Sequence, residues 1–256
     1  MSDNQRREEM LREMGISPIW RLRAGPGVTV EEPVSEPVTA ARKLIAEEPS
    51  PPTAPVAATP ADVASLDWTS LKACVADCTA CALHKGRNKT VFGVGDERAN
   101  WLFVGEGPGA DEDAQGEPFV GQAGKLLDNM LAAINLKRDA NVYIANIVKC
   151  RPPGNRNPQP DEAAACSPYL KRQIELIRPK LIVALGKVAA VNLLGRDASI
   201  SSLRGGVHDC GGIPLIVTYH PAYLLRTLPD KAKAWEDLCF AVTTMRGLQS
   251  EHAAAN

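Results

Sequence analysis

Cysteines are the residues whose type and spacing most directly suggest chemistry in this chain. Cys78 and Cys81 form a CxxC pair, "CTAC", which lets two sulfurs on one turn reach the same metal. Cys150 and Cys166 end an irregular segment, "CRPPGNRNPQPDEAAAC", with four prolines. Four thiolates suit Zn²⁺ or an iron–sulfur cluster, and spacing alone also allows unrelated thiols. Cys74 is a rival ligand because it shares a helical face with the CxxC pair.

A loop rich in glycine and acids, "GEGPGADEDAQGEPFVGQAG", follows the first strongly apolar run. The loop lacks the Lys-Ser/Thr of a phosphate-binding Walker motif, and its acids would repel phosphate. Such a loop can instead position a water or hold a flat polar ligand by backbone N–H groups. Phe119 stands alone among small residues, and it is either a stacking platform for that ligand or a core residue.

Four apolar runs must position these groups, and each reads as a buried strand. The runs cover residues 101–106, 142–148, 180–186 and 213–220. Helical patterns separate the first three, and a final helix is predicted from residue 230. This alternation predicts an α/β fold whose parallel sheet is covered on both faces. Ligands bind such sheets at the carboxyl ends of the strands, where "GEGPG", "NIVKC" and "HPAYLLR" lie.

The first 64 residues differ in composition from the rest. Residues 33–60 hold seven prolines and no aromatic residue, so we expect a disordered linker over residues 25–64. The segment 1–24 carries Met10, Leu11 and Met14 on one helical face and ends near Trp20. It is predicted to dock on a partner or, alternatively, to pack on its own domain. The globular domain is predicted to cover residues 65–250.

Composition excludes some classes of protein. The net charge is −1, with 29 basic and 30 acidic residues, which argues mildly against a nucleic-acid binder, although a neutral total can hide a basic face. No apolar run is long enough to cross a membrane, and the N-terminus has no secretory apolar region. We therefore expect a cytosolic protein whose cysteines are not structural disulfides.

Several motifs, taken in order, resemble one enzyme family. "VFGVG", "GEGPGADEDAQGEPFVGQAGKLL", "YIANIVKCRPPGNRNPQPDEAAAC" and "HPAYLLR" are similar to the family 4 uracil-DNA glycosylases, the iron–sulfur members of the uracil-DNA glycosylase superfamily. The resemblance covers roughly residues 74–245. It implies a three-layer α/β/α fold with a central four-stranded parallel sheet. It also implies an N-glycosyl hydrolase that flips uracil out of single- or double-stranded DNA and leaves an abasic site in base excision repair.

The family's site residues carry over to matching positions. A [4Fe–4S] cluster would be held by Cys78, Cys81, Cys150 and Cys166. The uracil pocket would comprise Glu106, Gly107, Glu112, Phe119, Asn146 and His220. Asn146 offers one donor and one acceptor, which suits O4 and N3–H of uracil and mismatches cytosine. His220 would hydrogen-bond O2 of the leaving uracil anion.

The catalytic carboxylate stays open at this point. Better-known families of the superfamily place an aspartate where this chain has Gly107. Glu106 or Glu112 would then orient the water, or binding of the base would supply most of the catalysis. Glu112 could equally crowd the uracil 5-position and exclude thymine. On the DNA side, we expect phosphate contacts from Arg151, Arg156 and Arg226. Tyr223, Leu224 and Leu225 are predicted to form a wedge that fills the gap in the helix, with helix packing as the alternative for the two leucines.

Two other functions remain compatible with the motifs. One is a non-catalytic iron–sulfur module that binds nucleic acid in a replication or repair complex, and the other is an electron-transfer protein. Residues 5–23 also resemble the clamp-loader-binding peptide of a bacterial polymerase III subunit. The expected protein is thus a monomer of the bacterial cytosol or nucleoid, without membrane contact.

Deletion of residues 1–30 tests the predicted partner. The truncated chain should lose binding to the clamp loader, because the apolar strip is gone, while its activity on free oligonucleotides stays intact. Pull-down and activity assays on the two chains measure this. Unchanged clamp-loader binding would exclude the docking role.

Overall fold

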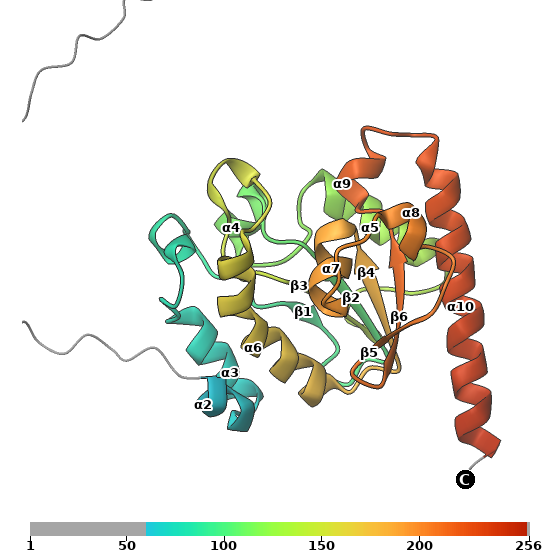
Figure 1. Ribbon diagram of the computed structural model, residues 1–256, viewed down its shortest axis with the longest axis horizontal. Helices are drawn as coiled ribbons and strands as arrows, with labels where there is room; N and C mark the ends of the chain where they lie inside the picture. Colours follow the sequence, from blue (N-terminus) through green and yellow to red (C-terminus); the bar gives the residue numbers. More distant parts are fainter. Residues whose placement is uncertain (1–59, 255–256) are drawn as a thin grey trace, which may run out of the picture. The chain divides into compact units, whose positions relative to one another are not determined.

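The structure is a computed structural model that describes residues 60–254 of the chain. Its helices are α2 (Pro60–Ser65), α3 (Trp68–Ala76), α4 (Ala110–Gln115), α5 (Gln122–Ala133), α6 (Pro160–Ile177), α7 (Lys187–Leu194), α8 (Ile200–Leu203), α9 (Pro221–Leu224) and α10 (Asp230–Ala254), with two 3-10 turns, η1 (Ala82–Lys85) and η2 (Pro153–Asn155) (Figure 1). Its strands are β1 (Val94–Gly95), β2 (Trp101–Gly105), β3 (Val142–Asn146), β4 (Leu181–Leu185), β5 (His208–Cys210) and β6 (Ile213–Thr218). The docking segment predicted at 1–24 and the linker up to residue 59 lie outside the described residues.

The globular domain begins earlier than the composition suggested. Helix α2 starts at Pro60, inside the stretch predicted as linker. Its Val63 is buried at 2% exposure in the core, and Arg172 Nε of α6 donates a hydrogen bond to the carbonyl of Leu66, just after α2. The proline-rich composition hid this turn because a single buried valine gives no periodic signal.

Four parallel strands form the centre of the sheet, as predicted. The strand order is β1-β3-β2-β4-β6-β5, and β3, β2, β4 and β6 are mutually parallel. The two edge strands, β1 and β5, pair antiparallel with their neighbours and were not predicted. They contain two and three residues, too few for a hydrophobic pattern. The fold prediction is confirmed with these two additions.

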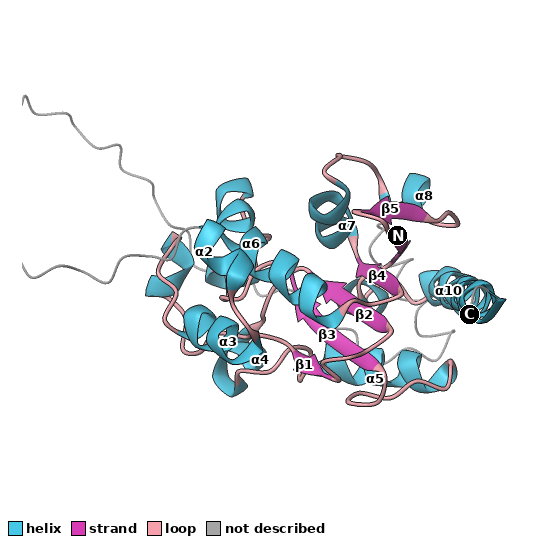
Figure 2. Ribbon diagram, turned by 90° about the horizontal axis from the view of Figure 1, so that it is seen from below, coloured by secondary structure: helices cyan, strands magenta, loops and turns pink. Residues whose placement is uncertain are grey.

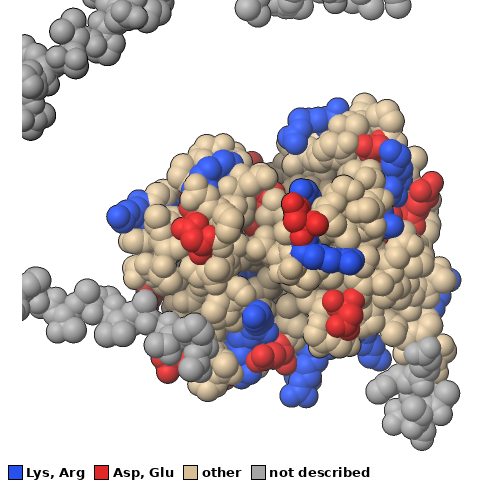
Figure 3. Space-filling model, in the orientation of Figure 1, with Lys and Arg blue, Asp and Glu red and all other residues tan. Residues whose placement is uncertain are grey.

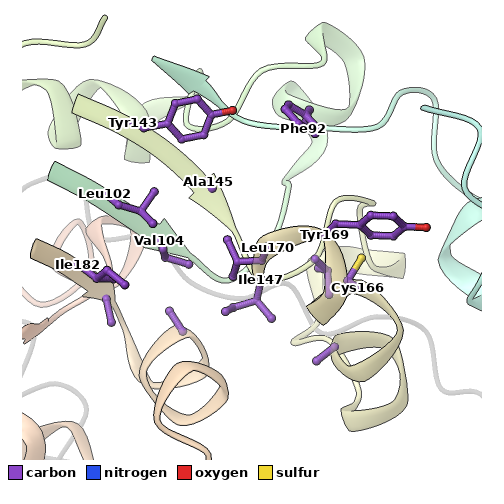
Figure 4. Close-up of a cluster of buried hydrophobic side chains, with 14 of the residues drawn as sticks. Phe92, Leu102, Val104, Tyr143, Ala145, Ile147, Cys166, Tyr169, Leu170 and Ile182 are labelled. Carbon is purple, nitrogen blue, oxygen red and sulfur yellow. The ribbon is translucent and has the colours of Figure 1, made fainter. Parts of the chain in front are cut away.

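Side chains alternate between two cores on opposite faces of the sheet. Leu102 and Val104 of β2 point into a core shared with α3, α6 and α7 (Figure 4). Trp101 and Phe103 point into the opposite core with α5 and α10. Figure 2 shows this layering, with α6 and α7 on one side of the strands and α5 on the other. All five residues of β2, β3 and β4 are buried, which explains their unbroken apolar runs.

Carboxylates in the first turn fix the starts of two helices beside the strand ends. Glu112 of α4 accepts a hydrogen bond from the N–H of Gly109 at 3.0 Å, and Glu162 of α6 accepts one from the N–H of Gln159 at 2.8 Å. Each bond satisfies an amide that the helix itself cannot use. No helix within residues 60–254 combines the length and apolar character that a bilayer span requires.

Candidate active site

A cavity of about 430 Å³ opens at the carboxyl ends of β2, β3 and β6. The six residues predicted for the base pocket all line it, although they come from five separate places in the sequence. They are Glu106, Gly107, Glu112, Phe119, Asn146 and His220. Parallel strands bring these segments together because their carboxyl ends share one edge of the sheet.

Phe119 is held in a strained backbone conformation at the cavity wall. Its φ is 56°, a left-handed value that a bulky residue rarely adopts. The guanidinium of Arg138 fixes it by donating to the carbonyls of Pro118 at 2.9 Å and Phe119 at 2.6 Å. The phenyl ring lies 5.5 Å from the imidazole of His220, at 30° between planes. Strain that the surroundings maintain in this way points to a functional position for the ring.

Gly105, the last residue of β2, makes room for two of these side chains. A Cβ at this position would lie 2.5 Å from both Asn146 Oδ1 and Phe119 Cζ, closer than real Cβ contacts come. Asn146 is 2% exposed, and its Oδ1 has no hydrogen-bond partner within the described residues. A buried acceptor without a partner lowers the stability of the fold by about 1–3 kcal/mol. This oxygen is therefore positioned to accept a hydrogen bond from an N–H or O–H group of a ligand.

His220 is fixed in one neutral form. The main-chain N–H of Ala222 donates to His220 Nδ1 at 3.1 Å, which leaves the proton on Nε2 and makes that atom a donor. Burial, and secondarily the positive charge of Arg226, lowers the pKa of His220 to about 4. At neutral pH the imidazole is therefore an uncharged hydrogen-bond donor.

The two candidate carboxylates are in different situations. Glu112 accepts hydrogen bonds from the N–H groups of Gly109, Val120 and Gly121 at 3.0, 3.0 and 3.2 Å, so it braces the loop that carries Phe119. Glu106 has no hydrogen-bond or ion-pair partner for its carboxylate within residues 60–254, and burial raises its pKa. Of the two, Glu106 is the carboxylate available to a water or a ligand.

The residues predicted to contact DNA divide into three kinds. Arg226 is exposed and lines the cavity. Arg156 also lines the cavity, but its guanidinium forms a double hydrogen bond with Glu162, at 2.8 and 2.6 Å, which neutralises its charge. Arg151 donates to Asn155 Oδ1 at 2.7 Å and does not line the cavity.

The assignment of Leu224 to a DNA wedge is corrected by its burial. Its side chain is 1% exposed and packs with Met130, Ala234 and Leu238 in a third apolar cluster. The following residue, Leu225, is 42% exposed and is the leucine of this motif that can reach a ligand. The sequence could not separate the two neighbours because both are apolar and both follow the same turn.

Sequence reasoning missed part of the cavity rim. Pro152, Asn155 and Asn157 line it, together with Tyr223, which was predicted for the wedge. The first three lie between Cys150 and Cys166. Their amides and prolines had been read as loop-forming residues, with no signal of which way they point.

The four cysteines predicted as ligands line a second, enclosed cavity. Cys74 does not line it. Burial raises the pKa of Cys81 and of Cys150 and raises that of Cys166 to about 12. These thiols would therefore hold their protons at neutral pH unless a metal displaced them.

Hydrogen-bond donors surround the sulfurs of this cavity. Arg87 donates to Cys150 Sγ at 3.1 Å, the Lys149 N–H to Cys166 Sγ at 3.4 Å, and the Tyr169 hydroxyl to Cys78 Sγ at 3.2 Å. Within the described part of the chain no three ligating side chains meet as they would around a single metal ion. An iron–sulfur cluster has a different requirement, because its thiolates bind separate iron atoms. Four cysteine sulfurs are a donor set that suits an iron–sulfur cluster or Zn²⁺.

Charge on the visible face is mixed. Figure 3 shows basic and acidic side chains interspersed over this side of the domain, with no single large basic area.

Comparisons with known proteins agree with this geometry. Residues 92–239 match the family model for the uracil DNA glycosylase superfamily. Three relatives are each named type-4 uracil-DNA glycosylase. The protein from Archaeoglobus fulgidus is 49% identical over 159 residues, 59% of this chain and 79% of its own length. That from Thermotoga maritima is 50% identical over 161 residues, 62% and 83%. That from Pyrobaculum aerophilum is 40% identical over 181 residues, 68% and 92%.

Proposed function

The chain belongs to the uracil-DNA glycosylase superfamily and, within it, to the type-4 enzymes; we propose that it hydrolyses the N-glycosidic bond of deoxyuridine in DNA and leaves an abasic site. A base inside a duplex is out of reach, so the deoxyuridine is first flipped out of the stack into the 430 Å³ cavity. Removal of the uracil base is the first step of base excision repair.

The unpaired buried Oδ1 of Asn146 is the observation that carries this proposal. In the flipped state Oδ1 accepts the N3–H of uracil, and the amide NH₂ donates to O4. Cytosine offers no donor at N3 and a donor at its exocyclic amino group, so both contacts fail. The Phe119 ring stacks on the flat base and fixes its plane.

His220 and Glu106 are the two groups that promote cleavage of the N-glycosidic bond. His220 Nε2–H donates to uracil O2, where negative charge develops as the bond to the sugar breaks. A neutral donor suits this step because it needs no proton transfer to the departing anion. Glu106, ionised, stabilises the cationic sugar and orients the water that attacks it. Glu112 maintains the loop that places Phe119.

A [4Fe–4S] cluster held by Cys78, Cys81, Cys150 and Cys166 is the cofactor we propose. When bound, it would cross-link the segments that carry these cysteines. The cross-link holds the loop between Cys150 and Cys166 against the cavity, where Asn155 and Asn157 form its rim. Arg87 and the Lys149 N–H compensate the charge of the thiolates.

We also propose how the protein contacts DNA and which protein it docks on. DNA phosphates contact Arg226, and Leu225 rather than Leu224 enters the space that the flipped nucleotide leaves. Single- and double-stranded DNA are both substrates. Residues 5–23 dock on the clamp loader, an expectation that rests on their apolar strip and on their resemblance to the clamp-loader-binding peptide of a bacterial polymerase III subunit. The enzyme works as a monomer in the cytosol.

Release of uracil from an oligonucleotide tests the function. The wild-type protein should generate alkali-labile abasic sites in uracil-containing DNA and none in the matched cytosine DNA. Asn146→Ala should lower the single-turnover rate by about tenfold to a hundredfold, because it removes both base contacts. Asn192→Ala is the matched control, since that amide bonds only within α7. Absence of strand cleavage by the wild type would favour a non-catalytic nucleic-acid-binding module.

The pH dependence of the rate tests the role of Glu106. Burial raises the pKa of this carboxyl above its ordinary 4.5, and only the ionised form can orient the water. The single-turnover rate should therefore fall as pH decreases through that raised value. His220 stays neutral over this range because its pKa is lowered to about 4.

Glu106→Gln should slow the reaction and remove this acid limb. The exposed Glu117→Gln serves as control, because Glu117 does not line the cavity. An acid limb that persists unchanged in Glu106→Gln would assign it to another group.

Paired cysteine variants test the ligand set. Cys166→Ser should lose bound iron and the visible absorbance of the cluster, and should weaken DNA binding and lower the melting temperature. Cys74→Ser should keep all four properties, since Cys74 does not line the cavity. Equal iron content in both variants would exclude Cys166 as a ligand.

A further inference from the structure

A buried polar junction lies behind the strand end that leads to His220. Thr218, the last residue of β6, donates its hydroxyl to Asp237 Oδ2 on α10 at 2.7 Å. Arg204, which follows α8, donates Nε to the same oxygen at 2.6 Å. Thr218 is fully buried, and Asp237 is 3% exposed. One carboxylate oxygen thus joins three elements at the point where β6 ends.

The junction continues into the residues on either side of His220. The Arg204 guanidinium lies over the Tyr219 ring at 5.0 Å, and that ring stacks on Tyr223 at 5.2 Å, 15° between planes. The Tyr223 hydroxyl donates to Asp230 Oδ2 at 2.6 Å. Tyr223 lines the base cavity, so the contacts run without a break from α8 to the cavity wall.

His220 has few polar contacts that would fix its ring. Within residues 60–254, the ring forms one hydrogen bond, with the N–H of Ala222 in the following turn, and it contacts the ring of Phe119. Gly186, which follows β4, packs so closely that a Cβ there would lie 2.9 Å from the Cβ of His220, and its N–H donates to the Thr218 carbonyl at 2.8 Å. The direction of the imidazole therefore depends on the main chain of residues 218–222, whose first part is held both by β4 and by the junction.

Stability alone does not account for the junction. Removing a carboxylate and a guanidinium from water is costly, and an apolar replacement of a buried ion pair is often neutral or stabilising. The Arg204–Asp237 pair nevertheless occupies this place, with side chains 14% and 3% exposed. Hydrogen bonds restrict direction as well as distance, which apolar packing does not.

We propose that Thr218, Asp237 and Arg204 are positioning residues for His220: they fix the end of β6 so that the Nε2–H of His220 meets O2 of the flipped uracil. The inference rests on the proposed uracil-DNA glycosylase activity. None of the three residues lines the cavity, so they act through His220 and not by contact with the base.

Two substitutions of Thr218 separate positioning from packing. Thr218→Val keeps the shape and loses the hydroxyl, whereas Thr218→Ser keeps the hydroxyl and loses the methyl group. If positioning governs the site, Thr218→Val should lower the single-turnover excision rate by about fivefold to tenfold, the equivalent of one hydrogen bond. Thr218→Ser should stay close to the wild type. The DNA dissociation constant should be unchanged in both.

The His220→Leu background provides the second readout. Once the imidazole is absent, Thr218→Val should have no further effect on the residual rate, because the two changes act through one group. Asp237→Asn, which weakens the bond with Arg204, should behave in the same way and replaces Thr218→Val if that variant fails to fold. Thr244→Val is the matched control, since its hydroxyl bonds only the Phe240 carbonyl within α10.

The outcomes are distinct from those for the function itself. A wild-type protein that releases no uracil contradicts the proposed function. An active wild type with Thr218→Val at the full rate, or with Thr218→Ser slower than Thr218→Val, overturns the positioning role. So does an equal fold-loss from Thr218→Val with and without His220.

Discussion

The parallel pairing of β2 with β3 ends with Gly105 opposite Asn146, and the base cavity depends on that pair. Without a side chain at Gly105, the Asn146 amide and the Phe119 ring approach each other across the strand end. The same register continues one step further, where the Ile147 and Val148 N–H groups donate to the carbonyls of Gly105 and Glu106. A close fit of two main chains therefore sets the distance between the Phe119 ring and the Asn146 amide.

Acidic residues in one short loop have divided roles because of their surroundings. Among the described residues, the Glu106 carboxylate has no hydrogen-bond partner in the cavity wall, whereas Glu112 accepts hydrogen bonds from three loop amides. Asp113, the next residue, is fully buried and accepts from the N–H and side-chain amide of Asn88. Asn88 adjoins Arg87, which bonds Cys150 Sγ. The loop that carries Glu106 is thus tied to the cysteine cavity through two neighbouring residues, Asn88 and Arg87.

The segment between Cys150 and Cys166 has a similar double attachment. Arg156 and Glu162 form an ion pair within it. The Glu162 carboxylate also caps the first turn of α6, the helix that carries Cys166. The prolines restrict the conformations available to the unfolded chain, and the Arg156–Glu162 pair fixes the folded segment against the start of α6. This attachment explains how an irregular segment can line a defined cavity.

The sequence by itself determined the four parallel strands, the helices between them and the residues that meet at their carboxyl ends. Strands that are buried on both faces of a sheet appear in the sequence as unbroken apolar runs. The residues that follow these runs meet at the carboxyl edge of the parallel sheet. The family resemblance then assigned roles to those residues. Only the tertiary structure decided that Glu112 braces a loop while Glu106 is free, that Leu224 is buried while Leu225 is exposed, and that Thr218, Arg204 and Asp237 meet behind His220. Burial and hydrogen-bond partners arise from segments far apart in the chain, so no local pattern of residues records them.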